Sequence, residues 1–210
     1  MKIEKIEPSL IMKLHQKDGI VFQTINDRKQ IKEAKKLRHD VYLEVGYITT
    51  PYPDGIIPDP EPSIYIVALL NGEELMGTVR VTPGPPFETL AVWENKFFAE
   101  SESLIKMLFD AKSAEIGSLA VKKTARGKRI SWGLYKALYL FALIEKIDFY
   151  VAGMDLNAYK LLQWLGWSLI EIGPVMEYMG SPSIPIIIPI KDQLSSVYQK
   201  NPTYYQYVVG

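Results

Sequence analysis

The sequence predicts one α/β domain, residues 1–210, built around a mixed sheet. Three observations predict it. The chain has 210 residues, of which 48% are hydrophobic and 23% charged, as in an ordinary globular domain. A strong hairpin pattern occupies residues 64–81, and strand and helix patterns alternate after residue 115. One hydrophobic core is therefore enough to hold this chain.

The composition excludes several classes of function. The 24 Lys and Arg residues balance 24 Asp and Glu residues, so no net charge favours nucleic acid or an anionic membrane. With no cysteine and only two histidines, His15 and His39, the chain offers no thiol chemistry and little for a metal site or a serine triad. No run approaches the roughly 20 apolar residues of a spanning helix, and acidic residues interrupt the apolar stretch in residues 1–14. We therefore expect a cytoplasmic protein without a metal, a nucleic-acid partner or stable membrane insertion.

The first half predicts a helix, a long irregular segment and a hairpin. Residues 26–45 carry apolar side chains at helical spacing, and the same stripe includes Arg38. Five prolines in residues 50–62 forbid a helix or a central strand there. Two apolar segments, 64–70 and 75–81, then flank the turn dipeptide Asn71-Gly72, which predicts a β-hairpin.

The second half predicts alternating elements. Residues 93–107 are expected to be helical or irregular, and residues 115–121 form a strand that runs into a basic segment. Gly166 is expected to end a short helix, and the alternation of isoleucine and proline over residues 184–190 favours the edge of a sheet. The remaining expected elements are a buried helix over 130–147, a strand over 149–154, a helix over 157–165 and a strand over 167–179.

The strongest chemical signal is the basic segment at residues 122–129, where five of eight residues are Lys or Arg. It lies between a strand and the start of a long helix. A helix start presents unpaired amides and the positive end of the helix dipole, so this position suits a phosphate. The alternative is a solvated, charged entry to the helix.

These residues also carry a resemblance. The strand Leu119-Ala120-Val121, the turn Arg126-Gly127-Lys128 and the following helix resemble the pantetheine-binding strand and phosphate loop of the GNAT acyltransferases. Residues 155–167 are similar to the last block of that family, and the hairpin end 77–81 completes the order. The resemblance implies the GNAT fold, with a twisted, mostly antiparallel sheet flanked by helices.

The sequence departs from the acetyl-CoA signature at two places. Arg129 and Ser131 stand where the signature has glycine and a small residue, and Leu162 replaces a tyrosine that acetyltransferases use as a general acid. An arginine would crowd the diphosphate of coenzyme A, whereas it suits the single phosphate of a carrier protein. We therefore expect an acyl carrier protein as donor rather than acetyl-CoA.

A narrower group within this fold fits better. The pairs Leu37-Arg38, Val41-Tyr42 and Gly46-Tyr47 resemble the block that opens the acyl-homoserine lactone synthases and the N-acyl amino acid synthases. Asp54, Arg80 and Glu115 stand where that group carries an acidic loop residue, a strand arginine and a strand glutamate. The Ser-Arg-Phe that follows the glutamate in the lactone synthases is absent. The chain therefore resembles the N-acyltyrosine synthases most.

This resemblance implies transfer of a long-chain acyl group from the phosphopantetheine of acyl carrier protein to the α-amine of an amino acid, with tyrosine as the first candidate and no tightly bound cofactor. Glu115 is the candidate base, because a buried carboxylate can have a raised pKa, and Glu94 is the alternative. Backbone amides from Leu119 to Val121, where the strands of this fold splay, would hold the oxyanion.

The remaining candidate residues bind substrate, phosphate or the acyl chain. Arg38 and Arg80 would be costly to bury alone, so each needs either the substrate carboxylate or a protein carboxylate such as Asp40, Asp54 or Glu115. Tyr42 and Ser118 are also expected to bind substrate. The expected phosphate ligands are Lys122, Arg126, Gly127, Lys128 and Arg129. The expected acyl-chain residues, which could equally be plain core, are Trp132, Tyr135, Leu138, Tyr139, Trp164 and Trp167.

Two other functions stay open. An acyl-homoserine lactone synthase with the same fold would use S-adenosylmethionine and release methylthioadenosine. A protein that kept the fold without catalysis could bind lipid or a carrier protein. The products made from an acyl donor discriminate these three functions.

Overall fold

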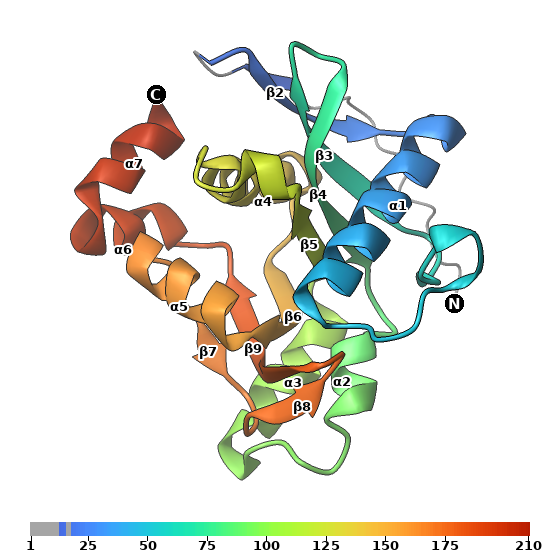
Figure 1. Cartoon of the computed structure of the whole chain (residues 1–210). Helices are drawn as coiled ribbons and strands as arrows, with labels where there is room; N and C mark the ends of the chain where they lie inside the picture. The colour runs from blue at the N-terminus through green and yellow to red at the C-terminus, as the bar shows by residue number, and fades with distance from the viewer. Residues whose placement is uncertain (1–12, 16–17) are drawn as a thin grey trace. The chain divides into compact units, whose positions relative to one another are not determined.

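The computed structural model of the chain describes residues 13–15 and 18–210 (Figure 1). Residues 1–12, on which the expectation about the apolar N-terminal stretch rests, lie outside the described residues. By its internal contacts the chain divides into two compact units. The first comprises residues 1–45, 49–83 and 118–141, and the second comprises residues 46–48, 84–117 and 142–210.

The first unit contains an antiparallel sheet in which each strand pairs with the next along the chain. Its strands are β1 (Lys13–His15), β2 (Ile20–Ile25), β3 (Ile64–Leu70) and β4 (Glu74–Pro83). The predicted hairpin is confirmed, with Tyr65 opposite Arg80 and a register shift between Ala68 and Leu69. This register places the phenol of Tyr65 beside the Arg80 side chain, on the face where the candidate site lies.

Helix α1 (Arg28–Val45) confirms the first predicted helix. Asp27 begins it, because its carboxylate accepts hydrogen bonds from the amides of Lys29 and Gln30, each at 3.0 Å. Ala34 of α1 packs on a cluster of buried side chains from β2 and β3. The same side of the helix carries Arg38, whose exposed fraction is only 2%.

The proline-rich segment is irregular, as predicted, apart from the short 3-10 turn η1 (Pro53–Gly55). It is held against α1: the amide of Tyr52 donates to Nε2 of His39 at 3.2 Å. Ile57 in the middle of the segment is buried. The segment therefore has a defined path over α1, and its next residues reach the arginines described below.

The basic segment forms the 3-10 turn η3 (Lys123–Ala125) and leads into helix α4 (Ile130–Glu145). Most of α4 is buried, as predicted, although Leu143 and Ile144 in its last turn are exposed. Gly133 lets the helix approach β2, since a Cβ atom there would lie 2.0 Å from the ring of Phe22. Strand β5 (Ser113–Val121) precedes this region, and its residues 118–121 belong to the first unit.

The second unit combines the beginning of β5 with strands from the C-terminal half. β5 runs parallel to β6 (Phe149–Asp155) over Ser113–Glu115, and β6 is antiparallel to β9 (Ser181–Pro189). The predicted strand 149–154 is thus confirmed. The helices of this unit are α2 (Glu88–Val92), η2 (Ala99–Ser101), α3 (Glu102–Asp110), α5 (Leu156–Leu165), α6 (Gln193–Lys200) and α7 (Pro202–Val209).

Two expectations about this unit were wrong. Residues 167–179 do not form one strand but the short strands β7 (Ile170–Glu171) and β8 (Met176–Tyr178), separated by a segment that contains Gly173 and Pro174. Strand β9 is also not an edge strand, since it pairs with β6 on one side and with β7 and β8 on the other. Pro185 is accommodated because it falls between the β7 and β8 ladders, where its carbonyl still accepts from the amide of Ile172 at 3.0 Å.

The predicted fold class, mixed α/β with a mostly antiparallel sheet, is confirmed. The short helix before Gly166 is also confirmed: Asp155 caps its first turn and Gly166 ends it with a φ of 92°. Within the described ranges, no helix is both long enough and apolar enough to cross a lipid bilayer.

Candidate active site

Arg38 and Arg80 converge on one carboxylate, that of Asp59. Arg38 comes from α1, Arg80 from β4 and Asp59 from the proline-rich segment. Nη1 of Arg80 donates to Oδ1 of Asp59 at 2.8 Å, and Nη1 of Arg38 donates to the same oxygen. Both arginines are at most 5% exposed, and the Asp59 side chain has no exposed surface. A helix, a strand and the proline-rich segment therefore meet at one buried carboxylate.

The other contacts of Asp59 keep its carboxylate ionised. Its second oxygen accepts from the hydroxyl of Tyr65 and lies 3.5 Å from Nζ of Lys35. Burial alone would raise the pKa of Asp59, but the charges of Arg38 and Arg80 and the hydrogen bonds from Tyr65 and Arg38 outweigh burial and hold it below its usual value. Burial and the bond to Asp59 raise the pKa of the Tyr65 phenol. Asp59 therefore stays ionised over the whole neutral range.

Asp59 is the protein partner that sequence reasoning missed. The candidates were Asp40, Asp54 and Glu115, but Asp40 is exposed and contacts His39, and Asp54 is exposed in η1. An acidic residue between Pro58 and Pro60 was the available signal. A short pattern such as Pro58-Asp59-Pro60 does not show that the aspartate of an irregular segment is buried. Only the folded chain therefore reveals this pairing.

Tyr42 and Ser118, the other two predicted substrate-binding residues, lie beside Arg38. Nη1 of Arg38 donates to Oγ of Ser118 at 3.0 Å, and the hydroxyls of Ser118 and Tyr42 share a hydrogen bond. Burial raises the pKa of the Tyr42 phenol, while the charge of Arg38 and the bond to Ser118 oppose that rise. Tyr42 is thus a neutral hydroxyl inside a positively charged cluster.

The five basic residues of the loop divide into two groups. Lys122 pairs with Glu74 at 2.6 Å, while Arg126 and Lys123 both pair with Glu44 on α1, at 2.9 and 3.8 Å. Three of the five charges are therefore engaged with protein carboxylates.

Lys128 and Arg129 form the second group. In the part of the chain that the structure describes, no carboxylate lies within ion-pair distance of either residue. The guanidinium of Arg129 lies over the ring of Trp132, 5.1 Å from its centre. Both residues immediately precede α4, whose first amides point out of the helix start. They are the loop residues best placed to receive an anion.

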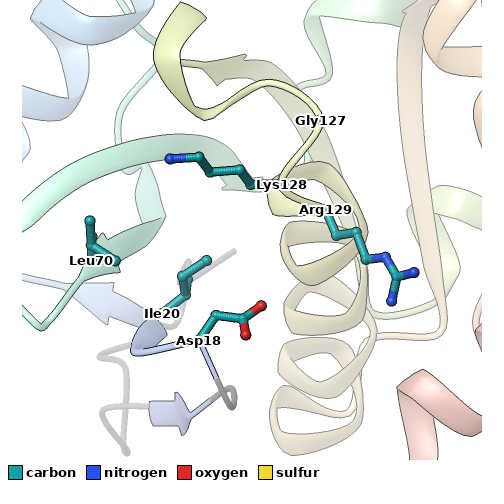
Figure 2. Close-up of a pocket in the computed structure, with 6 residues that line it drawn as sticks. All are labelled: Asp18, Ile20, Leu70, Gly127, Lys128 and Arg129. Carbon is teal, nitrogen blue, oxygen red and sulfur yellow. The ribbon is translucent and has the colours of Figure 1, made fainter.

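A cavity of about 410 Å³ opens beside these two residues (Figure 2). Gly127, Lys128 and Arg129 line one side of it, and Ile20 and Leu70 give it an apolar wall. Asp18 lies across from the loop and supplies one carboxylate. The cavity thus combines a cationic loop with an apolar wall, which is the combination that a phosphate on an organic chain requires.

Glu115 lies in the second unit, on the part of β5 that pairs with β6. Its carboxylate is 3% exposed and accepts three hydrogen bonds: from the amides of Glu88 and Thr89, both at 2.7 Å, and from the hydroxyl of Thr89 at 2.5 Å. Burial raises the pKa of Glu115, and these three bonds work against the rise. The carboxylate therefore holds the first turn of α2, a contact that sequence reasoning did not foresee.

The remaining predicted residues are distributed over both units. Leu119 and Val121 lie on β5 in the first unit, and Trp132, Tyr135, Leu138 and Tyr139 lie on α4 in the same unit. Trp167 is buried in the second unit, whereas Trp164 lies on the surface of α5 with 58% of its area exposed. Glu94, the alternative base, is exposed next to the fully buried Trp93. The acyl-chain pocket stays a prediction.

The comparison with protein families decides the assignment. The family model of the N-acyl amino acid synthase FeeM matches residues 33–165, more than half of the chain. The chain belongs to this family. The predicted N-acyltransferase activity is thereby supported for this FeeM-family member, and the matched range contains Arg38, Asp59, Arg80, Glu115 and the basic loop. No curated protein sequence matches the chain significantly.

Solved structures confirm the GNAT-like fold for this member of the FeeM family. FeeM, an N-acyl amino acid synthase from uncultured soil microbes, aligns with a TM-score of 0.67 and 16% identity over 88% of this chain and 98% of that chain. The lactone synthase LasI aligns with a TM-score of 0.66 and 16% identity over 86% and 95% of the two chains. BjaI, a CoA-dependent acyl-homoserine lactone synthase solved with SAM and isopentyl-CoA, aligns with a TM-score of 0.63 and 18% identity over 89% of this chain and 88% of that chain.

Proposed function

We propose that this enzyme transfers a long-chain acyl group from the phosphopantetheine thioester of acyl carrier protein to the α-amine of an amino acid, with tyrosine as the first acceptor to test. The observation that carries the acceptor half is the Arg38–Asp59–Arg80 cluster. Two buried guanidinium groups converge on one carboxylate, and the same pair of arginines would suit the carboxylate of an amino acid.

A buried hydrogen-bond donor in the same cluster supports a substrate that carries a negative charge. Nε of Arg38 is buried and has no hydrogen-bond partner within the described part of the chain. Such a donor is costly because it has lost its hydrogen bonds to water, and an acceptor atom from a bound ligand would satisfy it. An amino acid brings a carboxylate, whereas a simple amine does not. The cluster therefore favours an amino acid over an amine as acceptor.

The donor half rests on Lys128 and Arg129. These two residues stand at the start of α4 beside the cavity, and within the described chain neither forms an ion pair with a carboxylate. A phosphopantetheine group has a single phosphodiester at the end of a chain that can lie against apolar side chains. Acyl carrier protein, to which this group is attached, adds an acidic surface. A cationic loop in front of an apolar wall suits that donor.

Chemistry would follow the general route of amine acylation. A base takes a proton from the ammonium group, the free amine attacks the thioester carbonyl, and the thiol leaves as the oxyanion collapses. Backbone amides from Leu119 to Val121 are the proposed oxyanion donors. Glu115 stays the proposed base, and the alternative is that it only supports the first turn of α2.

The second candidate is an acyl-homoserine lactone synthase, because LasI and FeeM match this fold almost equally well. One assay separates the two. Purified enzyme is given an acyl carrier protein thioester with either tyrosine or S-adenosylmethionine, and products are identified by mass spectrometry. The proposal expects N-acyltyrosine and no methylthioadenosine. Lactone and methylthioadenosine from the second mixture would instead establish the lactone synthase. If neither mixture gave a product, a non-catalytic binding module would be the remaining candidate.

A further inference from the structure

Ser118 has a backbone conformation that is unusual for its residue type. It lies inside β5, yet its φ is 60°, in the left-handed region. Residues with a Cβ atom rarely adopt this region, and glycine enters it without penalty. A non-glycine residue keeps such a conformation only where neighbouring contacts hold it in place.

Two side chains supply these contacts through the Ser118 hydroxyl. Nη1 of Arg38 donates to Oγ at 3.0 Å, and the buried phenol of Tyr42 shares a hydrogen bond with the same hydroxyl. A serine hydroxyl has one donor and two acceptor positions, so both contacts can be made at once. Arg38 and Tyr42 come from adjacent turns of α1, which makes this helix the support of the strand residue.

Arg38 is itself fixed from the other side. Its Nη2 donates to the carbonyl of Ile57 at 2.5 Å, and its Nη1 also contacts Asp59. A continuous chain of contacts therefore runs from the proline-rich segment through Arg38 to Ser118. The position of Ser118 is defined by charged, buried groups and not by a flexible loop.

The consequence lies in the residues that follow. A residue with positive φ turns the next peptide unit relative to an extended strand, so Ser118 sets the direction of the amides from Leu119 onward. We propose that Arg38 and Tyr42 act through Ser118 as positioning residues, holding β5 in the one conformation that presents the Leu119–Val121 amides to the reacting carbonyl. This inference rests on the proposed acyl transfer and assigns Tyr42 and Ser118 a role other than contact with the acceptor.

Ser118→Gly and Ser118→Ala form the matched pair that tests it. Both variants lose the hydroxyl, but only alanine keeps a Cβ atom that opposes positive φ. With acyl donor and tyrosine, the alanine variant is expected to lose about 10- to 100-fold in kcat with little change in KM for tyrosine. The glycine variant is expected to keep clearly more activity than the alanine variant, because glycine adopts this φ without steric cost.

Tyr42→Phe completes the design. Alone it should lower kcat by about three- to tenfold, the loss of one hydrogen bond. In the Ser118→Gly background it should cost less than it does alone, because its bond to the Ser118 hydroxyl is already absent. Equal losses in the glycine and alanine variants would overturn the proposal and show that the hydroxyl itself meets substrate. Wild-type activity in both would overturn it as well.

A second readout does not depend on the reaction. Amide hydrogen exchange of Leu119 and Ala120, followed by NMR in the protein without substrates, should accelerate in Ser118→Ala by about tenfold and more weakly in Tyr42→Phe. Unchanged exchange in both variants would refute the positioning role. If wild-type enzyme makes no N-acyl product while these exchange rates respond as expected, the proposed function has failed and the positioning of β5 has not.

Discussion

Arg38 and Asp59 form a buried ion pair that joins helix α1 to the proline-rich segment. The pair is completed by Arg80 from β4, so a helix, an irregular segment and a strand meet at one carboxylate. In this FeeM-family enzyme the cluster ties the proline-rich segment to α1 and β4, and we propose that its arginines also hold the carboxylate of the acceptor.

Asp59→Asn should destabilise the first unit strongly, because it removes the charge of the carboxylate on which two buried guanidinium groups converge. Removing one partner of a buried ion pair costs about 3–5 kcal/mol, and urea unfolding followed by fluorescence measures it. Asp54→Asn is the matched control, since Asp54 is exposed and makes no ion pair in the described chain. A loss for Asp59→Asn no larger than that control would show that the cluster does not hold the fold.

The same carboxylate predicts how stability depends on pH. The pKa of Asp59 is lowered in the folded state, so its contribution is present above the unfolded value of 3.8 and is lost as the pH falls through the lower folded value. Wild-type protein should therefore lose stability in this acidic window faster than Asp59→Asn does. Identical slopes of unfolding free energy against pH below 4 would contradict this role of Asp59.

Arg129→Gln and Arg126→Gln test the division of the basic loop. Arg129 is expected to meet the donor phosphate, whereas the charge of Arg126 is engaged by Glu44. Loss of one charged phosphate contact in Arg129→Gln should raise the KM for acyl carrier protein thioester about tenfold and change kcat less. The KM should change less in Arg126→Gln than in Arg129→Gln.

The same assays with acyl-CoA in place of the carrier protein identify the donor. The proposal expects a clear preference for acyl carrier protein, which should weaken as salt is added, because steering by Lys128 and Arg129 is screened. Equal use of the two thioesters by wild-type enzyme would refute the donor assignment even if both arginine variants behaved as expected.

Glu115→Gln separates a base from a helix support. A missing base should lower kcat by about 10² to 10⁴ at every pH, while the fold stays intact. Thr89→Val is the informative companion, since it keeps the carboxylate but removes the hydroxyl that donates to it at 2.5 Å. That bond lowers the pKa of Glu115, so its loss should move the acidic limb of the kcat profile to higher pH.

A purely structural Glu115 gives a different pattern. Glu115→Gln and Thr89→Val would then both lower the melting temperature, because each removes contacts to the first turn of α2, and kcat of the folded enzyme would stay near wild type. In that case Glu94→Gln becomes the next variant to assay.

Local patterns in the sequence predicted the elements that local physics determines. The periodicity of α1, the Asn71-Gly72 turn and the buried stripe of α4 each depend on neighbours within one or two turns, and all three are confirmed. The prolines of residues 184–190 misled, because a proline also fits a central strand where the facing ladder is interrupted.

The site was predicted in part for the same reason. The helical and strand patterns placed Arg38 and Arg80 on buried faces, which a charged residue reaches only with a partner. Asp59 and the left-handed φ of Ser118 arise from contacts between segments far apart in the sequence. No pattern within either segment encodes those contacts, so only the folded chain shows them.

Arg80→Gln links the cluster to acceptor choice. The variant should lower kcat/KM for tyrosine strongly and change kcat/KM for tyramine little, because tyramine has no carboxylate for Arg80 to bind. The ratio of the two values is independent of how much of the variant is folded. An equal fall for both acceptors would make Arg80 structural only.

Competition between tyrosine and tyramine for one acyl carrier protein thioester tests the central claim most directly. If the buried arginines hold the acceptor carboxylate, wild-type enzyme should favour tyrosine roughly 30-fold or more in N-acyl product, because tyramine leaves a desolvated guanidinium without its anion. Equal yields of N-acyltyrosine and N-acyltyramine in the same reaction would contradict the recognition of an amino acid by this site.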